Sequence, residues 1–415
     1  MNNNTEEPPM SLSRRTLLGT AAATAAVRPA FAQRPKIRLG VLNDMSGPYA
    51  DDGGPVSLAC TRQAVQEWGD KGFDVEVLSG DHQNKPDVGA ALARRWFDVD
   101  GVDAIVDVPT SSVALAVNTV CREKNKVLLN SGAATADLTG LQCSPNTIHW
   151  TYDTYMLSHS TAGAMVKAGG DSWYFITADY VFGQQLERDS AAVVTGSGGK
   201  VLGTRRYPFP DTTDFSSYLV QAQASGAKVL GLANAGNDTI NAIKQAAEFG
   251  LTKTMKIAMM LGSLRTVQAL GLEAAQGLIF SESFFWDLNE RTRAFTNRVK
   301  SKLTKSNQWL TMTPVGCYGA SLHYLKAVEA MGAGAAKADG AAAVAQMKKM
   351  PTDDDAFGPG RIREDGRTLH PVYLFQAKTP KESSGGWDLV KIIATTPAEE
   401  AFRPLKDGGC PMIKA

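Results

Sequence analysis

The sequence predicts an α/β fold in which two Rossmann-like units share one chain. Strand-like and helix-like segments alternate from residue 36 to residue 130. The alternation begins again after residue 151 and continues to about residue 281. Such alternation is typical of parallel sheets covered by helices on both faces. A chain of 415 residues is long enough for two such units.

The first unit opens with a continuous apolar strand at residues 36–43. The breakers Gly47-Pro48 and Gly53-Gly54 mark a loop after this strand. The remaining periodic segments predict helices at 56–69, 87–98 and 111–124, and strands at 73–79, 102–108 and 126–130.

The second unit repeats the pattern with more strands and ends in a β-rich tail. The expected strands are 172–177, 200–204, 228–233, 256–261 and 278–281. The expected helices are 183–196, 214–225, 237–249, 263–270, 289–305 and 314–331. An Ala/Gly-rich linker is expected at 332–343, followed by hairpin-like strands at 361–363, 369–376 and 388–394.

The N-terminal residues have the features of an export signal. Arg14 and Arg15 precede a short apolar stretch, and Ala30-Phe31-Ala32 is a small-x-small cleavage pattern. The stretch is well short of the roughly 20 residues that span a bilayer. We therefore expect a twin-arginine signal peptide at residues 1–32, cleavage near Ala32 and a periplasmic protein.

Charge and cysteine content exclude several classes of function. Without the signal region the chain holds 40 basic and 40 acidic residues, so neither nucleic acid nor an anionic membrane is an expected partner. No metal or cofactor is expected, because the Cys and His residues lack metal-ligand spacing. The sequence also lacks the HExxH, GxSxG, GxxxxGK[ST] and GxGxxG motifs, which argues against an enzyme.

One or two disulfides are expected among the five cysteines, with the pairing open. These cysteines are Cys60, Cys121, Cys143, Cys317 and Cys410.

Three loops at predicted strand ends combine small residues with hydroxyl groups. They are residues 45–49, 110–112 and 132–135. Free backbone N–H groups at the start of a helix favour an anion. Ordinary N-capping by Ser and Thr is the alternative explanation for each loop taken alone.

Taken together, the loops and several longer stretches resemble a known family. The stretches include LGVLNDMSGPYADDGG, NSGAATADLT, ITADYVFGQQL and AAQGLIFSESFFW. They are similar, in the same order, to the periplasmic solute-binding proteins of ABC importers of the leucine/isoleucine/valine type. The resemblance implies two lobes that close on a small ligand, three crossovers, an inner-membrane permease as partner and a monomer. It places lobe 1 at 36–149 and 284–350, lobe 2 at 151–283 and 351–395, and a tail at 396–415.

The resemblance also implies a set of ligand-binding residues. In the first lobe, the ligand carboxylate is held at Ser111 and Ser112 and at Ala133 and Thr135. The further expected contacts are Tyr49, Asp52, Tyr152, Phe182, Asn234, Ala235, Met260 and Tyr318. Core packing is the alternative role for each aromatic residue.

One departure from the family bears on the ligand. Amino-acid-binding members carry an acidic residue after the strand that matches 256–261, whereas this chain has KIAMMLGS there. Because a buried ammonium needs a partner, the expected ligand is an aromatic or apolar carboxylate without an amino group. The alternative is that Asp52, Asp179 or Glu282 supplies the charge. Two other ligand classes therefore stay open, namely a branched-chain amino acid and an amide or urea. A sensor role beside a chemoreceptor or kinase also stays open.

Overall fold

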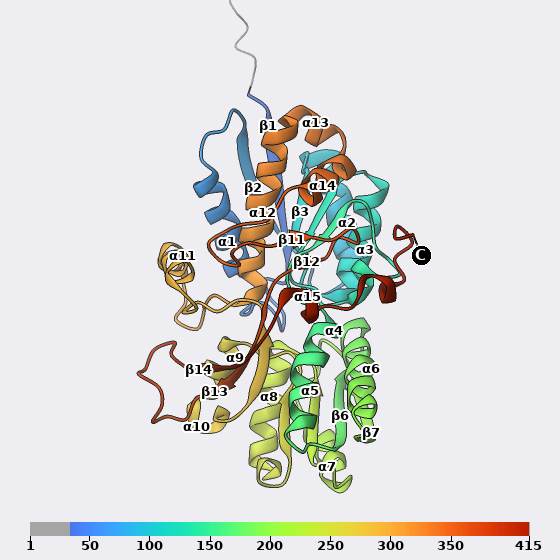
Figure 1. Cartoon of the computed structure of the whole chain (residues 1–415), viewed down its shortest axis with the longest axis vertical. Helices are drawn as coiled ribbons and strands as arrows, with labels where there is room; N and C mark the ends of the chain where they lie inside the picture. The colour runs from blue at the N-terminus through green and yellow to red at the C-terminus, as the bar shows by residue number, and fades with distance from the viewer. Residues whose placement is uncertain (1–33, 415) are drawn as a thin grey trace, which may run out of the picture. The chain divides into compact units, whose positions relative to one another are not determined.

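Two β-sheets with parallel cores, each covered by helices, make up residues 34–414, which this computed structural model describes (Figure 1). Residues from Pro35 onward form one compact unit. The predicted α/β fold with two lobes is confirmed. The predicted signal peptide lies outside the described residues. No helix in the range 34–414 is long and apolar enough to cross a membrane.

The first sheet has the order β2-β1-β3-β4-β5, and every neighbouring pair is parallel. Its strands are β1 (Lys36–Asn43), β2 (Asp74–Asp81), β3 (Ala104–Asp107), β4 (Val127–Asn130) and β5 (Thr147–His149). Strands β3, β4 and β5 are buried along their whole length, as expected for a sheet with helices on both faces.

Helices from both halves of the chain cover this first sheet. They are α1 (Gly54–Trp68), α2 (Pro86–Arg95), which continues as the π-helical turn Trp96–Asp100, α3 (Ser111–Glu123), α11 (Glu290–Lys300), α12 (Met312–Met331), α13 (Ala333–Ala338) and α14 (Gly340–Lys349). Helix α12 packs against α1, β3 and β4 (Figure 1). The chain therefore returns to the first lobe after building the second.

The second sheet has the order β14-β13-β10-β9-β8-β6-β7. Its parallel strands are β6 (Ser172–Ala178), β7 (Lys200–Tyr207), β8 (Val229–Ala233), β9 (Lys256–Met259) and β10 (Ile279–Glu282). Two antiparallel strands, β13 (Val372–Ala377) and β14 (Val390–Thr396), extend the sheet beyond β10. The associated helices are α4 (Thr154–Leu157), the π-helical turn Ser158–Ala162, α5 (Gly163–Lys167), α6 (Val181–Gly196), α7 (Ser216–Ala224), α8 (Gly236–Glu248), α9 (Leu264–Leu270) and α10 (Leu272–Ala275).

The prediction of a linker at 332–343 is wrong, because this stretch belongs to α13 and α14. Alanine has the highest helix propensity of any residue. The side chain of Asp339 accepts a hydrogen bond from the backbone N–H of Ala342 and caps α14. A buried stripe from Ala336 to Val344 then holds both helices on the lobe.

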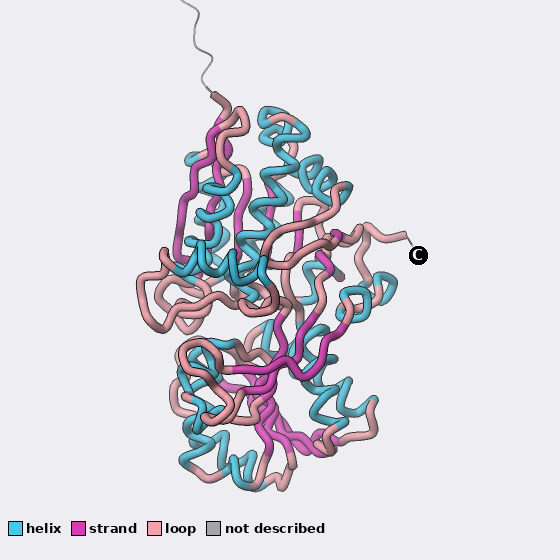
Figure 2. The backbone as a smooth tube through the Cα atoms, turned by 60° about the vertical axis from the view of Figure 1, so that its left-hand side comes forward, coloured by secondary structure: helices cyan, strands magenta, loops and turns pink. Residues whose placement is uncertain are grey.

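The third passage between the lobes lies later in the chain than predicted. Residues 351–395 were expected in the second lobe, but Arg367 forms a parallel bridge with His149 at the edge of the first sheet. The short strands β11 (Arg361–Ile362) and β12 (Thr368–Leu369) pair with each other there. Only β13 and β14 join the second sheet. Figure 2 shows the strands and loops that run between the two sheets.

The C-terminal tail returns from the second lobe to the first lobe and so forms a fourth crossover between them. After β14, the tail forms α15 (Ala398–Ala401) and the 3-10 turn Leu405–Gly408. A disulfide then joins Cys410 to Cys143, which are 267 residues apart in the sequence. The other three cysteines, Cys60, Cys121 and Cys317, are buried free thiols. The tail is therefore covalently fixed to the first lobe.

Removing this disulfide is expected to lower stability. We predict that Cys143→Ser with Cys410→Ser lowers the free energy of unfolding by about 2–4 kcal/mol, because the unfolded chain gains conformational entropy. Chemical denaturation with and without a reductant measures the change. The reductant should have no further effect on the double variant. An equal free energy of unfolding for the wild type and the double variant would show that the disulfide does not stabilise the protein.

A cavity between the two lobes

A cavity with about 600 Å³ of empty space, part of it open to solvent, lies where the carboxyl ends of the parallel strands of both sheets face each other. Open α/β sheets place their ligands at this edge. Five of the predicted site residues line the cavity: Tyr49, Asp52, Tyr152, Phe182 and Ala235. They follow β1, β5, β6 and β8, so the two lobes contribute to one site.

The first-lobe wall is built from backbone that runs close to the cavity. Pro109, Gly132 and Ala134 line it, and the hydroxyl of Tyr152 donates a 2.6 Å hydrogen bond to the carbonyl of Gly132. A Cβ atom at Gly132 would lie 2.5 Å from both Oδ1 of Asp107 and Cα of Pro109. This position therefore requires glycine, which leaves the backbone open toward the cavity.

The backbone at the end of β3 is strained. Asp107 and Val108 have φ angles of 83° and 62°, a region that side chains rarely adopt. Burial raises the pKa of Asp107 to about 7, although a hydrogen bond from the side-chain amide of Asn43 favours the charged form. Strain of this kind persists where the surrounding structure holds it, often at binding sites.

The four residues expected to hold a carboxylate do not line the cavity themselves. Ser111 is buried and Ser112 is half-buried at the start of α3, just beyond Pro109. The N–H of Ala133 donates to Oδ1 of Asn130 at 3.3 Å. The hydroxyl oxygen of Thr135 accepts from the N–H of Asp137 at 3.3 Å. Their neighbours in the same two loops form the wall instead.

Aromatic side chains close one side of the cavity. The hydroxyls of Tyr49 and Tyr180, from different lobes, lie 2.6 Å apart. The ring of Phe209 stacks on both, at centroid distances of 5.5 and 4.3 Å. Burial raises the pKa of both phenols, so the pair stays neutral. A ligand here meets rings and neutral hydroxyls.

The lobes approach closely beside this aromatic wall. Gly236, at the start of α8, lines the cavity with a φ of 60°. A Cβ atom there would lie 2.6 Å from the carbonyl oxygen of Pro48 in the first lobe. The N–H of Asn237 donates to the same oxygen at 3.3 Å. Glycine at this position allows the two backbones to meet.

An ion pair spans the lobes at the cavity rim. Nε of Arg265 lies 3.1 Å from Oδ1 of Asp52, and the hydroxyl of Ser263 donates to the same oxygen at 3.1 Å. Nη2 of Arg265 also donates to Oδ1 of Asn237 at 3.0 Å. The side chain of Arg265 is only 4% exposed. Asp52 is therefore already neutralised by the second lobe.

Glu282 is a buried carboxyl in the cavity wall at the end of β10. Its two oxygens accept hydrogen bonds from the N–H groups of Leu264 at 3.2 Å and Met312 at 2.9 Å. Burial raises its pKa to about 8, and the charge of Asp52 adds to the rise. The sequence predicts Glu282 only as an alternative source of charge, because its position in the cavity depends on the fold.

Glu282 should make stability depend on pH. Its pKa rises from 4.5 to about 8 on folding, so the unfolded chain loses this proton first as the pH increases. The contribution of Glu282 to the free energy of unfolding is therefore complete below pH 4.5 and is lost as the pH rises toward 8. We expect Glu282→Gln to reduce the fall in unfolding free energy between pH 5 and pH 8, by about 4 kcal/mol at most.

Chemical denaturation at the two pH values measures this slope. The exposed Glu273→Gln is the matched control and should leave the slope unchanged. Identical slopes for wild type and Glu282→Gln would contradict a protonated Glu282 in the folded state.

Three predicted residues lie in the protein interior rather than in the cavity. Asn234 is buried and accepts a 2.7 Å hydrogen bond from the hydroxyl of Thr239. Met260 is buried in the core of the second lobe. Tyr318, on α12, donates to Oε2 of Glu67 at 2.6 Å and packs on Phe295. Asp179 is exposed and accepts from Gln184, so it does not face the cavity.

Other cavity residues were not predicted from the sequence. They are Gly53, Leu261, Gly262, Ser263, Thr266, Thr311, Met312 and Thr313, together with Pro109, Gly132, Ala134 and Gly236 described above. Most follow a strand end or begin a helix, which is the signal that could have found them. Among residues 34–414 no cluster of His, Cys, Asp and Glu could hold a metal ion.

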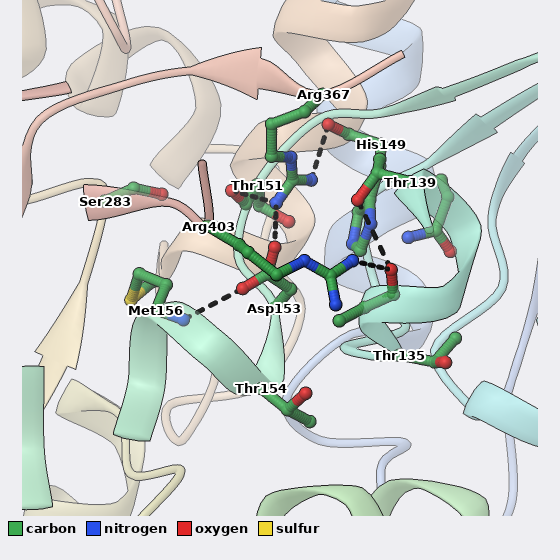
Figure 3. A network of polar contacts seen from close by, with 12 residues as sticks. Thr135, Thr139, His149, Thr151, Asp153, Thr154, Met156, Ser283, Arg367 and Arg403 are labelled. Carbon is green, nitrogen blue, oxygen red and sulfur yellow. Dashed lines mark hydrogen bonds and ion pairs between the residues drawn. The ribbon is translucent and has the colours of Figure 1, made fainter. Parts of the chain in front are cut away.

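A buried polar network joins the crossovers behind the cavity (Figure 3). Arg367 has no exposed side-chain surface, and its guanidinium donates to the carbonyls of His149 and Thr151. It also pairs with Oδ2 of Asp153 at 3.3 Å. Oδ1 of Asp153 accepts from the N–H of Met156 and so caps α4, the first helix of the second lobe. One side chain thus ties the first crossover to the third.

The tail reaches the same region. In Figure 3, Arg403 extends toward the turn that contains Thr139. Its Nη2 donates to the carbonyl of Ala136 at 3.2 Å. The ring of Phe402 lies 4.7 Å from the guanidinium carbon of Arg367. The tail therefore contacts both the crossover that contains Arg367 and the turn that follows the loop 132–135.

Comparison with known proteins agrees with this architecture. A periplasmic binding protein of Burkholderia mallei is 44% identical, with a TM-score of 0.87, covering 92% of this chain and all of the other. A branched-chain amino acid ABC transporter periplasmic ligand-binding protein of Burkholderia xenovorans is 37% identical, with a TM-score of 0.78, covering 91% and 99%. A Leu/Ile/Val-binding protein homolog of Brucella melitensis is 26% identical over 364 residues, 86% of this chain and 91% of the relative.

The family model described as periplasmic binding protein matches residues 36–386. That span covers the first sheet, every strand of the second sheet except β14, and the cavity between them. Members of this family bind ligands and do not catalyse reactions. The chain belongs to the periplasmic binding protein family.

Proposed function

We propose that the protein is the substrate-binding component of an ABC importer and captures a small carboxylate with an apolar or aromatic body. The observation that carries this proposal is the cavity lined by Tyr49, Tyr152, Tyr180, Phe182 and Leu261 from the two lobes. Rings and apolar side chains suit an apolar ligand body. The two relatives described as transport or Leu/Ile/Val-binding proteins support the importer role.

The ligand carboxylate is proposed to bind at the first-lobe loops. Pro109, Gly132 and Ala134 already line the cavity, and the loops continue into Ser111–Ser112 and Ala133–Thr135. Of the lining residues, Gly132 and Ala134 offer backbone N–H groups for the anion, so no basic residue is needed. Tyr49, Asp52, Tyr152, Phe182 and Ala235 complete the proposed contact set.

The setting is proposed to be the periplasm, with an inner-membrane permease as partner and a monomer as the working form. The twin-arginine signal that the sequence predicts at residues 1–32 supports export. A sensor that presents the same ligand to a receptor would use the same closure, so a permease-dependent uptake assay separates the two roles.

A second ligand class is favoured by one specific observation. The strand end at 256–261 carries no carboxyl, but Glu282 lies in the cavity wall. Its hydrogen bonds come only from backbone N–H groups, so a ligand ammonium would be its ionic partner. An apolar amino acid is therefore the second candidate.

A thermal-shift screen with matched pairs tests both classes. Each pair differs by one amino group: 4-methylpentanoate with leucine, and 3-phenylpropanoate with phenylalanine. A ligand that binds only the folded protein raises the melting temperature. We expect at least one member of a pair to do so. If neither member of either pair shifts the melting temperature, the carboxylate proposal fails.

The Glu282→Gln variant then identifies the class. Loss of the shift with leucine or phenylalanine, but not with the matched acid, assigns Glu282 to the ammonium. A shift by the simple acids alone, unchanged in the variant, assigns the ligand to the simple carboxylates, whereas an amino-acid shift that survives in the variant contradicts the role of Glu282.

A further inference from the structure

The C-terminal tail contacts the turn that directly follows a loop of the binding site. This 3-10 turn, Ala136–Thr139, begins where the loop 132–135 ends. The N–H groups of Asp137 and Leu138 donate to the hydroxyl and carbonyl oxygens of Thr135, at 3.3 and 3.4 Å. Because the last residue of the loop caps the turn, a displacement of the turn also displaces the loop that lines the cavity.

Arg403 of the tail binds this turn directly. Its Nη2 donates to the carbonyl oxygen of Ala136 at 3.2 Å, and its side chain points toward the turn in Figure 3. The carbonyl oxygen of Arg403 accepts a 2.7 Å hydrogen bond from Nη1 of Arg363. Arg363 lies between β11 and β12, so Arg403 connects the turn with this pair of strands.

The tail packs against the end of the turn without space for a further side chain. A Cβ atom at Gly140 would lie 2.7 Å from Nη2 of Arg403 and 2.8 Å from the carbonyl oxygen of Gly408. The disulfide between Cys143 and Cys410 follows within a few residues on both segments. A hydrogen bond, a close backbone contact and a covalent bond therefore hold the turn against the tail.

The same turn also contacts the second lobe. Nε2 of the buried Gln185, on α6, donates to Oδ2 of Asp137 at 2.8 Å. The turn therefore has three neighbours, namely the loop 132–135, α6 and the tail. A turn of four residues forms few hydrogen bonds of its own, so these neighbours set its position.

The tail lies beyond residues 36–386, the span that the family model matches. We propose that it is an additional positioning element of the binding site, with Arg403 as a positioning residue. Arg403 acts through Ala136. It keeps the loop 132–135 where the ligand carboxylate binds, and it keeps the turn within reach of α6 in the second lobe. This inference rests on the proposed function, which places the carboxylate at that loop.

Calorimetric titration of Arg403→Met measures the effect on binding. The probes are 4-methylpentanoate, leucine, 3-phenylpropanoate and phenylalanine. Any probe that the wild type binds should bind this variant about tenfold more weakly, because a charged hydrogen bond to the turn is lost. Arg403→Lys keeps a cation that can donate to the same carbonyl oxygen and should recover most of the affinity. Equal losses in the two variants would contradict a role for this hydrogen bond.

Arg361→Met is the matched control on the same tail. Nη2 of Arg361 lies 2.7 Å from Oε2 of Glu399, in α15 at the start of the tail. This variant removes an ion pair of the tail but leaves the contact with the turn, so its affinity should stay within twofold of the wild type. A loss as large as that of Arg403→Met would overturn the specific role of Arg403.

Hydrogen exchange of the ligand-free protein gives a readout that does not depend on the carboxylate. Backbone amides of residues 136–140 should exchange at least tenfold faster in Arg403→Met, and at the wild-type rate in Arg361→Met. Unchanged exchange in Arg403→Met overturns the positioning of the turn. Faster exchange with unchanged affinity shows that the turn does not affect the ligand, and it overturns the proposal as well.

Two further outcomes are distinguished by the same measurements. If Arg403→Met does not fold, Cys143→Ser with Cys410→Ser releases the end of the tail and should change exchange and affinity in the same directions. If none of the four probes binds the wild type, the proposed function fails. Exchange at residues 136–140 then decides by itself whether the tail positions the turn.

Discussion

Replacement of Arg367 by Met is expected to lower the free energy of unfolding by about 3–5 kcal/mol, the largest stability change that we predict for a single site. The guanidinium is fully buried and pairs with Asp153, whose side chain is 3% exposed. Removing the cation leaves that carboxylate buried without its partner. Burial lowers the pKa of Arg367 to about 10, and Asp153 and Asp365 oppose the shift, so the charge is retained at neutral pH.

Arg361→Met is the matched control for this experiment. Arg361 pairs with Glu399 at 2.7 Å, but their side chains are 55% and 63% exposed. Solvent screens such a pair, so the change should be much smaller. Urea denaturation followed by circular dichroism compares the two variants. Equal losses of unfolding free energy in the two variants would mean that the buried ion pair of Arg367 is no more stabilising than the exposed pair of Arg361.

Replacement of Arg265 by Met is expected to weaken ligand binding by about 30-fold or more. The side chain connects Asp52 of the first lobe with Asn237 of the second, and Asp52 lines the cavity. A buried charge left unpaired at such an interface costs about 2–5 kcal/mol. The cost falls on the closed form, in which the lobes meet, and so appears as lost affinity.

A double-mutant cycle with Asp52→Asn measures the coupling directly. The double variant should recover part of the affinity that Arg265→Met loses, because no carboxylate is then left unpaired. Strictly additive losses would contradict an inter-lobe ion pair. Calorimetric titration with whichever acid or amino acid shifts the melting temperature supplies the affinities.

Most of the fold could be predicted from the sequence because its signals are local. The strand 36–43 was predicted with the bounds that the structure has, and the helix at 111–124 ends within one residue of α3. Apolar runs and helical periodicity specify such elements without reference to distant residues. The tail was harder, since Arg367 pairs at the edge of a sheet whose strands end more than 200 residues earlier.

The site was predictable at the level of loops but not of single side chains. The loop 132–135 was located correctly, yet Gly132 and Ala134 face the cavity rather than Ala133 and Thr135. Which residue of a loop faces a cavity depends on backbone angles that the strained turn at Asp107 helps to set. Local sequence does not reveal those angles.

The charges of the site come from long-range contacts. Asp52 and Arg265 are 213 residues apart, and their pairing follows only from the closure of two lobes. Glu282 meets the N–H groups of Leu264 and Met312 for the same reason. The sequence names Asp52, Asp179 and Glu282 as alternative partners for a ligand amino group, but it does not reveal that only Asp52 and Glu282 line the cavity.

The central claim is that the cavity between the lobes captures a small carboxylate. The most direct test is a calorimetric titration of the wild type and of Ala235→Trp with 4-methylpentanoate and leucine. Ala235 lines the cavity at the start of α8, so an indole ring there occupies the ligand space. We predict one-to-one binding of at least one of the two by the wild type and none by the folded variant. Binding that Ala235→Trp leaves unchanged would place the ligand elsewhere and contradict the claim.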